Sequence, residues 1–208
     1  FQTAVAQAEL ESREYPGFYH RLAFHIVDEA AAVKAEAAGA PVEGGVDVCI
    51  ETTRPELLPA CVALVAHPDD ERFKPLFGTT VTSPVFGVEV PVLPHSAAEK
   101  DKGAGIAMCC TFGDTTDIDW WRDLELPLRA ILRKDGRIEA ETPDWITSEA
   151  GREMYTAMAG KTAYSAREAL VAELAATGEM RGEPTKTVRQ ANFFEKGDKP
   201  LEIVTSRQ

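Results

Sequence analysis

The most informative run of the chain, Lys102–Trp121, contains two carboxylates three residues apart. The run passes from a turn with two glycines through an apolar strand at 106–111, and Asp114 and Asp117 follow at the start of a predicted helix. In a pocket, a carboxylate most naturally binds an ammonium group. The same spacing fits a helix cap, with Asp114 at the N-cap position and Asp117 in the first turn. The pair is therefore either a site for a cationic substrate group or a helix start.

A second candidate is the segment Thr52-Thr53-Arg54-Pro55, which joins two hydroxyls to a guanidinium. Threonine hydroxyls can donate to a carbonyl or to an attacking water, and Arg54 can hold a phosphate or the edge of a base. The alternative is a helix N-terminus, in which Thr53 is the cap and Pro55 lies in the first turn. The two interpretations are compatible, because a helix start can also form one wall of a site.

The cysteines indicate neither a nucleophile nor a metal site. All four lie in apolar runs without CxxC spacing or a nearby histidine, at Cys49, Cys61, Cys109 and Cys110. A Cys-His hydrolase would combine Cys109 or Cys110 with His67 or His95. Neither thiol has basic neighbours in the sequence that would lower its pKa, so this alternative is weak. We expect buried, reduced thiols and predict no metal site.

The composition narrows the class of function. The 208 residues include 34 Asp plus Glu against 22 Lys plus Arg, which gives a formal net charge of −12. A broad nucleic-acid surface needs many basic contacts to phosphates, so we expect no DNA binding, although a narrow contact with one strand end remains compatible. No apolar stretch approaches the ~18 residues of a membrane span, and the first residues lack a signal-peptide pattern. We expect a cytoplasmic protein without membrane contact.

Many short apolar segments separated by glycine and proline predict a β-rich core. The predicted strands lie at 18–27, 46–51, 61–66, 80–83, 88–93, 106–111 and 128–133. Residues 2–14 are expected to form a helix or linker that is broken at Tyr15-Pro16-Gly17. The Ala/Glu-rich segment 28–45 is expected to be a surface excursion between two antiparallel strands, whose loss should be tolerated.

The pattern becomes helical after about residue 143. Helices are predicted at 148–158 and 165–177, the second with a capping box of Ser165 and Glu168 and a left-handed end at Gly178. We divide the chain into four parts: an incoming linker (1–14), a β-rich core (15–143), a helical segment (144–180) and a return linker (181–208). The predicted fold is α+β and mainly β, with a closed or half-closed β-barrel-like core, peripheral helices and a two-stranded linker ribbon.

Three segments, taken together, resemble the editing domain of valyl-tRNA synthetase: 51–61, 102–121 and 201–208. The resemblance covers essentially all 208 residues, and the Cys-Thr-Phe-Gly-Asp segment is similar to the archaeal-like subgroup. It implies a piece of a longer class I synthetase, in which this domain interrupts the catalytic domain. Neither nucleotide signature of that catalytic domain occurs here. We therefore expect ATP and magnesium to bind the parent's catalytic domain, and no cofactor to bind this chain.

The resemblance implies post-transfer editing, in which a positioned water hydrolyses the aminoacyl ester of threonyl-tRNA for valine. Thr52 and Thr53 are the implied catalytic wall, facing the terminal adenosine and the scissile ester, and Arg54 is implied to bind the substrate beside them. Asp117 would hold the α-ammonium, and Asp114 would accept the threonine hydroxyl. The expected partners are the 3′ CCA end of valine tRNA and the remainder of the parent synthetase.

Three positions depart from the commoner bacterial pattern of this family. Leu57 stands where a threonine often follows the Arg-Pro-Glu motif, and Met108 and Cys110 replace a lysine and a threonine of the strand that lines the pocket. We keep Met108 and Cys110 as candidate substrate-binding residues. Two other functions stay open: a tRNA-docking insertion that no longer hydrolyses, and an editing domain of isoleucyl- or leucyl-tRNA synthetase.

Overall fold

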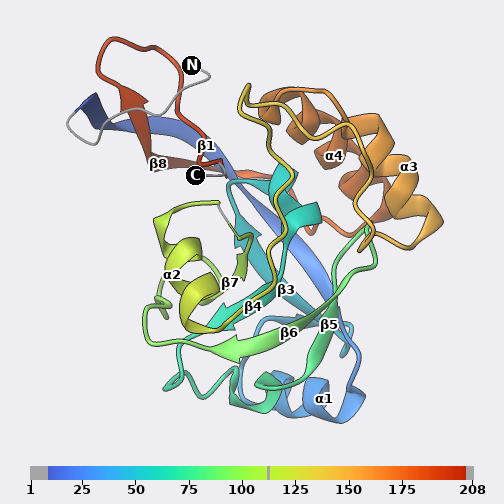
Figure 1. Ribbon diagram of the computed structural model, residues 1–208. Helices are drawn as coiled ribbons and strands as arrows, with labels where there is room; N and C mark the ends of the chain where they lie inside the picture. Colours follow the sequence, from blue (N-terminus) through green and yellow to red (C-terminus); the bar gives the residue numbers. More distant parts are fainter. Residues whose placement is uncertain (1–8, 112, 205–208) are drawn as a thin grey trace.

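The computed structural model of the chain describes residues 9–111 and 113–204 (Figure 1). Parts of both predicted linkers, residues 1–8 and 205–208, and Phe112 of the Lys102–Trp121 run lie outside the described residues. The fold consists of an eight-stranded mixed sheet with helices around it, which confirms the predicted α+β class. Within the described ranges, no helix is long and apolar enough to cross a membrane.

The strands follow most of the predicted segments. Their bounds are β1 Leu10–Ile26, β2 Val42–Glu43, β3 Asp47–Thr52, β4 Ala63–Ala66, β5 Thr80–Thr82, β6 Glu89–Pro94, β7 Ile106–Cys109 and β8 Thr185–Phe194. Hydrogen bonds order seven of them β2-β3-β1-β5-β6-β4-β7, and β8 pairs with β1 outside this row. The β4–β6 pair is parallel, which makes the sheet mixed. Residues 128–133 do not form the predicted strand, and Leu132 makes an isolated bridge with Ile138 instead.

The predicted barrel is wrong, because the sheet does not close. The row ends at β2 and β7, and β7 approaches β3 without pairing with it. The second edge of β3 is already occupied by β2 and by Pro41, whose carbonyl accepts a hydrogen bond from the Cys49 N–H at 2.9 Å. A strand has two hydrogen-bonding edges, and at residues 47–49 both edges of β3 are occupied, by β1 on one side and by β2 with Pro41 on the other, so β7 cannot pair there.

The long strand β1 belongs to two parts of the molecule. Residues 10–19 pair antiparallel with residues 185–194 of β8, and this ribbon projects from the sheet, while residues 20–26 pair with β3 and β5 (Figure 1). The predicted break at Tyr15-Pro16-Gly17 is wrong. In a two-stranded ribbon each strand has an outer edge, where a proline without an N–H removes no ladder hydrogen bond.

The helices lie around the sheet, and the helical pair of the second half lies beside the loop that follows β3 (Figure 1). Their bounds are α1 Glu29–Ala37, α2 Thr115–Asp123, α3 Glu149–Met158 and α4 Ala163–Thr177, with short 3-10 helices η2 Pro55–Ala60 and η3 Lys74–Leu76. The α4 helix starts earlier than predicted, because Thr162 and not Ser165 is the cap: Thr162 Oγ1 accepts the Ser165 N–H at 3.3 Å. Gly178 ends α4 with a φ of 77°, as predicted.

The excursion at 28–45 contributes to the core. Antiparallel strands flank it, as predicted, but it folds into α1, whose N-cap is Asp28. Ala31, Ala32 and Ala35 are buried in the main hydrophobic cluster. Removing the excursion would expose the apolar surface that these alanines cover, which argues against the tolerance that we expected.

Candidate functional site

The predicted acidic pair lies on a turn that leads from β7 into α2; we call residues 113–117 the acidic turn. Asp114 is the N-cap of α2, and its Oδ1 accepts the Asp117 N–H at 2.9 Å. In return, Asp117 Oδ2 accepts the Asp114 N–H at 3.2 Å, which confirms the helix-start interpretation as a capping box. Asp114 is exposed, whereas Asp117 is only 8% exposed. The turn therefore offers one solvated and one buried carboxyl group.

The carboxyl group of Asp117 is held by backbone amides. Besides the Asp114 N–H, it accepts the Cys110 N–H at 3.4 Å through Oδ1. Burial, and then the charge of Asp114, raise the pKa of Asp117 to about 7, although backbone hydrogen bonds and the charge of Arg54 act in the opposite direction. Asp117 is therefore close to half-ionised near neutral pH, and a bound cation would favour its ionised form.

Gly113 connects the acidic turn to the threonine-arginine segment. A Cβ atom at this position would lie 2.2 Å from Asp117 Oδ2 and 3.3 Å from Leu57 Cδ1, so glycine provides the space for the Asp117 carboxyl group. The Gly113 carbonyl accepts a hydrogen bond from Arg54 Nη1 at 3.1 Å. The structure thus brings together the two segments that the sequence identified separately.

Thr52 and Thr53, which we call the threonine wall, lie where β3 ends. Thr52 pairs with His20 of β1, and its Oγ1 accepts the Arg54 N–H at 3.0 Å. Arg54 and not Thr53 is the N-cap of η2, and Pro55 follows at the first position, so the predicted cap is wrong by one residue. Both threonines are half-buried. The Thr52 hydroxyl accepts a backbone hydrogen bond in this turn, which leaves its O–H as a donor.

A buried ion-pair cluster, which our sequence reasoning missed, surrounds Arg54. Arg54 Nε donates to Glu56 Oε1 at 3.1 Å, and Arg54 Nη2 donates to Glu202 Oε2 at 2.6 Å. Glu56 is fully buried and accepts two further hydrogen bonds, both at 2.7 Å, from Arg167 of α4. Burial opposes the charge of Glu56, but the hydrogen bonds from Arg167 and the charges of both arginines hold its pKa below the usual range.

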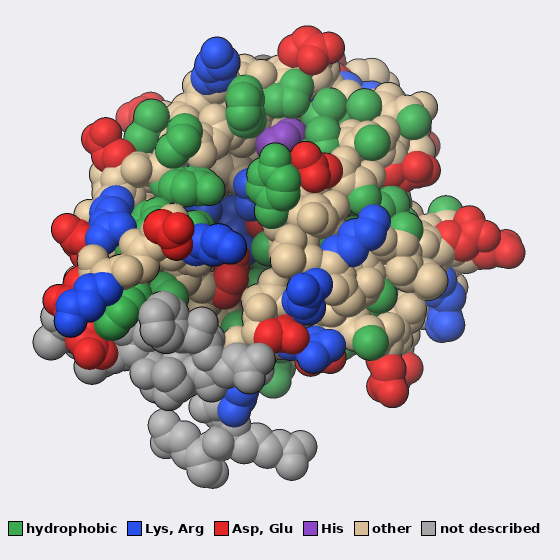
Figure 2. All heavy atoms as spheres, turned by 90° about the horizontal axis from the view of Figure 1, so that it is seen from above, with side chains coloured by type: hydrophobic (Ala, Val, Ile, Leu, Met, Phe, Trp, Pro, Cys, Tyr) green, Lys and Arg blue, Asp and Glu red, His purple; other side chains and the backbone are tan. Residues whose placement is uncertain are grey.

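The guanidinium of Arg54, which we expected to hold a phosphate or a base, is bound to two carboxylates and one carbonyl of the protein. Glu56 stands two residues from Arg54, so this half of the cluster had a local signal. Arg167 is 111 positions from Glu56 and lies in an ordinary Ala/Glu-rich helix, which carries no such signal. Seen from above, the surface is hollowed, and basic and acidic side chains lie together within the hollow (Figure 2).

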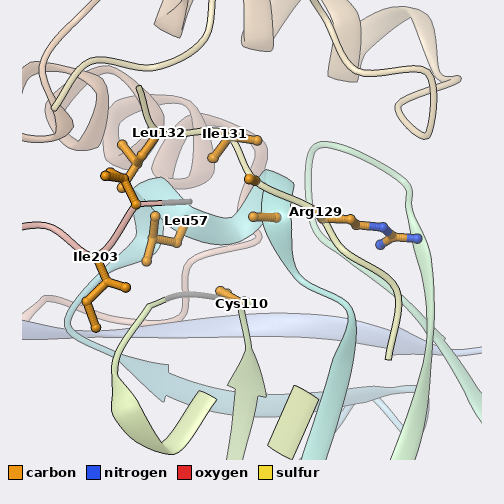
Figure 3. A pocket seen from close by; sticks show the side chains of 9 residues that line it. Leu57, Cys110, Arg129, Ile131, Leu132 and Ile203 are labelled. Atoms are coloured by element: carbon orange, nitrogen blue, oxygen red, sulfur yellow. The ribbon is translucent and has the colours of Figure 1, made fainter. Parts of the chain in front are cut away.

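Met108 and Cys110 are both buried, and Met108 faces Leu64 across the sheet. Cys110 lies at a small, mainly apolar cavity, and Figure 3 shows the side chains that gather there: Leu57, Ile131, Leu132 and Ile203. The cavity measures about 20 Å³, which is room for roughly one water molecule. It is therefore too small to hold an amino acid.

An open groove of about 580 Å³ provides the larger space. Its lining residues are Tyr19, His67 and residues 98–103. Binding sites for small molecules commonly measure ~300–1,000 Å³. Lys102 on the rim pairs with Glu99 at 3.0 Å, and the hydrogen bond to Glu99 together with the charge of Asp114 raises the pKa of Lys102. The groove has room for an aminoacylated nucleoside, and the acidic turn is near enough to act electrostatically on its rim.

The cysteines are free and buried, as expected. Burial raises the pKa of the Cys109 and Cys110 thiols well above the usual value, so neither supplies a thiolate at neutral pH. Among residues 9–111 and 113–204, no group of three His, Cys, Asp or Glu side chains is arranged to hold a metal ion. The structure gives no support to the Cys-His alternative.

The open mixed sheet and its surrounding helices match a solved CP1 domain. The crystal structure of GlLeuRS-CP1 aligns with a TM-score of 0.54 over 79% of this chain and 97% of that chain. The sequence identity is 12%, so this likeness establishes the fold alone. No protein-family model matches the chain. The chain therefore has a CP1-type fold.

Its relatives in sequence are valine–tRNA ligases. Over all 208 residues the chain is 62% identical to that of Cutibacterium acnes, 60% to that of Bifidobacterium longum and 58% to that of Thermobifida fusca. It spans about a fifth of the length of these curated relatives (22%, 21% and 22%). The chain is thus a homologue of one segment of the valine–tRNA ligases. These relatives are actinobacterial, so the archaeal-like subgroup is not supported.

Proposed function

We propose that the chain is the editing domain of a valine–tRNA ligase, and that it hydrolyses the ester of threonine wrongly attached to valine tRNA. Asp117 carries the proposal, because its carboxyl group is buried and its hydrogen bonds within the described structure come from backbone amides. Such a group gains from a cation, and the α-ammonium of an aminoacyl ester is one. Each carboxylate oxygen has a second lone pair, so capping and ammonium binding are compatible.

The need for such a site follows from the size of the two amino acids. Threonine has nearly the shape of valine and carries a hydroxyl in place of one methyl group, so a pocket that accepts valine cannot strongly reject it. A second site must therefore recognise the hydroxyl and cleave the wrong ester. The valine–tRNA ligase relatives favour this substrate over the isoleucyl and leucyl alternatives.

In this proposal the terminal adenosine of the tRNA occupies the open groove, and the ester lies between the threonine wall and the acidic turn. Asp117 binds the α-ammonium, and the exposed Asp114 accepts the hydroxyl of threonine. Valine has no such hydroxyl and would leave Asp114 desolvated without a partner, which supplies selectivity. Met108 of β7 and Cys110, which follows that strand, are buried and form part of the packing beneath the pocket.

Hydrolysis needs a positioned water and no covalent enzyme intermediate, since an aminoacyl ester is already activated. The water oxygen bonds to the carbonyl carbon, the bond to the ribose oxygen breaks, and the water proton passes to that ribose oxygen, which releases threonine and tRNA. Thr52 and Thr53 orient the carbonyl or the water, and the neighbouring ribose hydroxyl assists the proton transfer. The rate gain comes mainly from holding these groups in place.

The test uses the full-length ligase that contains this segment. Asp117→Ala should slow the deacylation of threonyl-tRNA for valine by about 100-fold or more, because the ammonium is no longer held, and should leave valylation unchanged. Asp119→Ala is the matched control, since Asp119 lies on the same helix and pairs with Arg122 at the surface. Wild-type deacylation by the Asp117 variant would reduce this residue to a helix cap.

One observation favours a second function, a tRNA-docking insertion without hydrolysis. Met108 and Cys110 place apolar side chains where the related pattern has polar ones, and both are buried. The wild-type ligase distinguishes the two functions directly. Release of threonine from threonyl-tRNA for valine supports editing, whereas tRNA binding without any release supports docking.

A further inference from the structure

The cluster around Glu56 joins three separate parts of the chain. Glu56 and Arg54 flank Pro55 at the start of η2, Arg167 comes from α4, and Glu202 from the segment that follows β8. Arg167 binds both oxygens of Glu56, each at 2.7 Å, in the paired geometry that arginine forms with a carboxylate. Glu56 is fully buried, so the carboxylate of this pair is shielded from solvent.

Arg54 carries the effect of this cluster to the acidic turn. Glu56 fixes its Nε, and the Nη1 atom on the same guanidinium plane donates to the Gly113 carbonyl at 3.1 Å. Gly113 in turn has Asp117 Oδ2 packed where a Cβ would lie. Arg54 thus contacts the backbone beside the buried carboxyl group, and two carboxylates hold Arg54 in place: Glu56, which is itself bound by α4, and Glu202.

We infer that Glu56 and Arg167 are positioning residues of the hydrolytic site, acting through Arg54 on the carbonyl of Gly113 and so on the acidic turn. The inference rests on the proposed function. It links the helix α4 to the hydrolytic site, because α4 supplies Arg167, one partner of the buried ion pair. A buried ion pair is weak evidence for stability alone, since well-packed apolar residues often serve as well. The two directional hydrogen bonds between Arg167 and Glu56 suit this ion pair to holding the side chains of the cluster in one arrangement.

The decisive variant is Arg167→Met in the full-length ligase, which keeps much of the side-chain volume and removes the guanidinium. The kcat for deacylation of threonyl-tRNA for valine should fall by about 10- to 100-fold, as a shift near 1 Å at a reacting group causes, while KM changes little. The preference for threonyl over valyl ester should fall as well, because Asp114 lies on the displaced turn. Valylation should be unchanged.

Two further variants separate positioning from a structural role. Arg181→Met is the matched control: Arg181 is 33% exposed against 23% for Arg167, and it binds Asp47 and Glu43 away from the acidic turn. Arg167→Lys keeps the charge without the paired geometry and should recover only part of the lost kcat. A loss with Arg181→Met equal to that with Arg167→Met would overturn the inference.

The double variant Glu56→Gln with Arg167→Met remains informative where a single variant folds poorly, because it removes one charge of each sign from the cluster. Recovery of thermal stability without recovery of deacylation supports positioning, and recovery of both overturns it. The two proposals fail separately. A wild-type ligase that does not release threonine contradicts the editing function, whereas normal release by wild type and by Arg167→Met contradicts only this inference.

Discussion

Glu56 and Asp117 are both buried carboxyl groups that lie near Arg54, but their surroundings differ. Glu56 receives hydrogen bonds from two arginines, which hold its pKa below the usual range despite burial. Asp117 receives backbone hydrogen bonds and lies beside a second acid, and its pKa rises to about 7. The first carboxylate already has its cations within the protein. The second is suited to receive one from a ligand.

This contrast indicates how Arg54 can influence the acidic turn through protein contacts alone. Arg54 donates one direct hydrogen bond to Glu56, beside the two from Arg167, but reaches Asp117 only through space and through the Gly113 carbonyl. If Arg54 formed a direct ion pair with Asp117, its charge would compensate the carboxylate that the proposed function uses to bind an ammonium. The proposed binding of an ammonium by Asp117 therefore requires that Arg54 pair directly with Glu56 and not with Asp117.

Glu56→Gln should have the largest effect on stability. A neutral amide leaves Arg54 and Arg167 without their buried counter-charge, so the free energy of unfolding should fall by about 3–5 kcal/mol. Urea unfolding of the 208-residue chain at pH 7 measures this loss. Glu71→Gln breaks an exposed pair with Lys74 and should cost less than about 1 kcal/mol. Similar losses in both variants would remove the distinction between buried and exposed pairs.

The two acids should respond to pH in opposite directions. The pKa of Glu56 is lowered, so its contribution to stability is present above about pH 4.3 and is lost as the pH falls through its folded value. The pKa of Asp117 is raised, so the folded state keeps a proton that the unfolded state releases, and stability falls as the pH rises from about 4 to 7.

Asp117→Asn should abolish this second dependence. Relative to the variant, the wild-type chain should lose about 1.4 kcal/mol per pH unit between about pH 4 and 7. Denaturant unfolding of both proteins from pH 4 to 8 gives the two curves. Parallel curves would mean that Asp117 ionises in the folded chain as it does in the unfolded one.

Gly113→Ala tests the contact between the turn and the buried carboxyl group. The added Cβ would lie 2.2 Å from Asp117 Oδ2, so the variant should lose about 1–3 kcal/mol of stability by overpacking. In an Asp117→Ala background the oxygen is gone, and the same substitution should cost clearly less. Unfolding of the four proteins completes the double-mutant cycle, and additive effects would show that the two residues do not interact.

The smallest effect concerns the cap of the helix that presents Arg167. Thr162→Ala should destabilise the chain by about 1 kcal/mol, because Thr162 Oγ1 caps α4, whereas Ser165→Ala should change stability by less than about 0.5 kcal/mol. Thermal unfolding of the two variants compares the observed cap with the one predicted from the sequence. A larger loss at Ser165 would restore the predicted helix start.

The local parts of the site could be predicted, because they depend on neighbours in the chain. The spacing of Asp114 and Asp117 indicated a capping box, and the start of η2 was predicted to within one residue. The partner of Glu56 could not be predicted in this way. It lies 111 positions along the chain, and although Arg167 is the one basic residue of α4, no local pattern in that helix links it to Glu56.

The fold shows the same limit. Alternating and apolar runs predicted most strands, but closure of the sheet depends on which segment occupies the second edge of β3, and β2 has only two residues. Pro16 was predicted to lie in a break, because the sequence alone does not show that it lies in a two-stranded ribbon, where a proline fits on the free edge. Both features are set by pairing between distant segments.

The strand β1 runs without interruption from Leu10 in the ribbon to Ile26 in the sheet, and its His20 pairs with Thr52 of β3. At about 3.3 Å per residue it is roughly 55 Å long. One continuous strand therefore connects the ribbon to the residue that pairs with the threonine wall. A displacement of the ribbon would reach the threonine wall through paired strands and not through a loop.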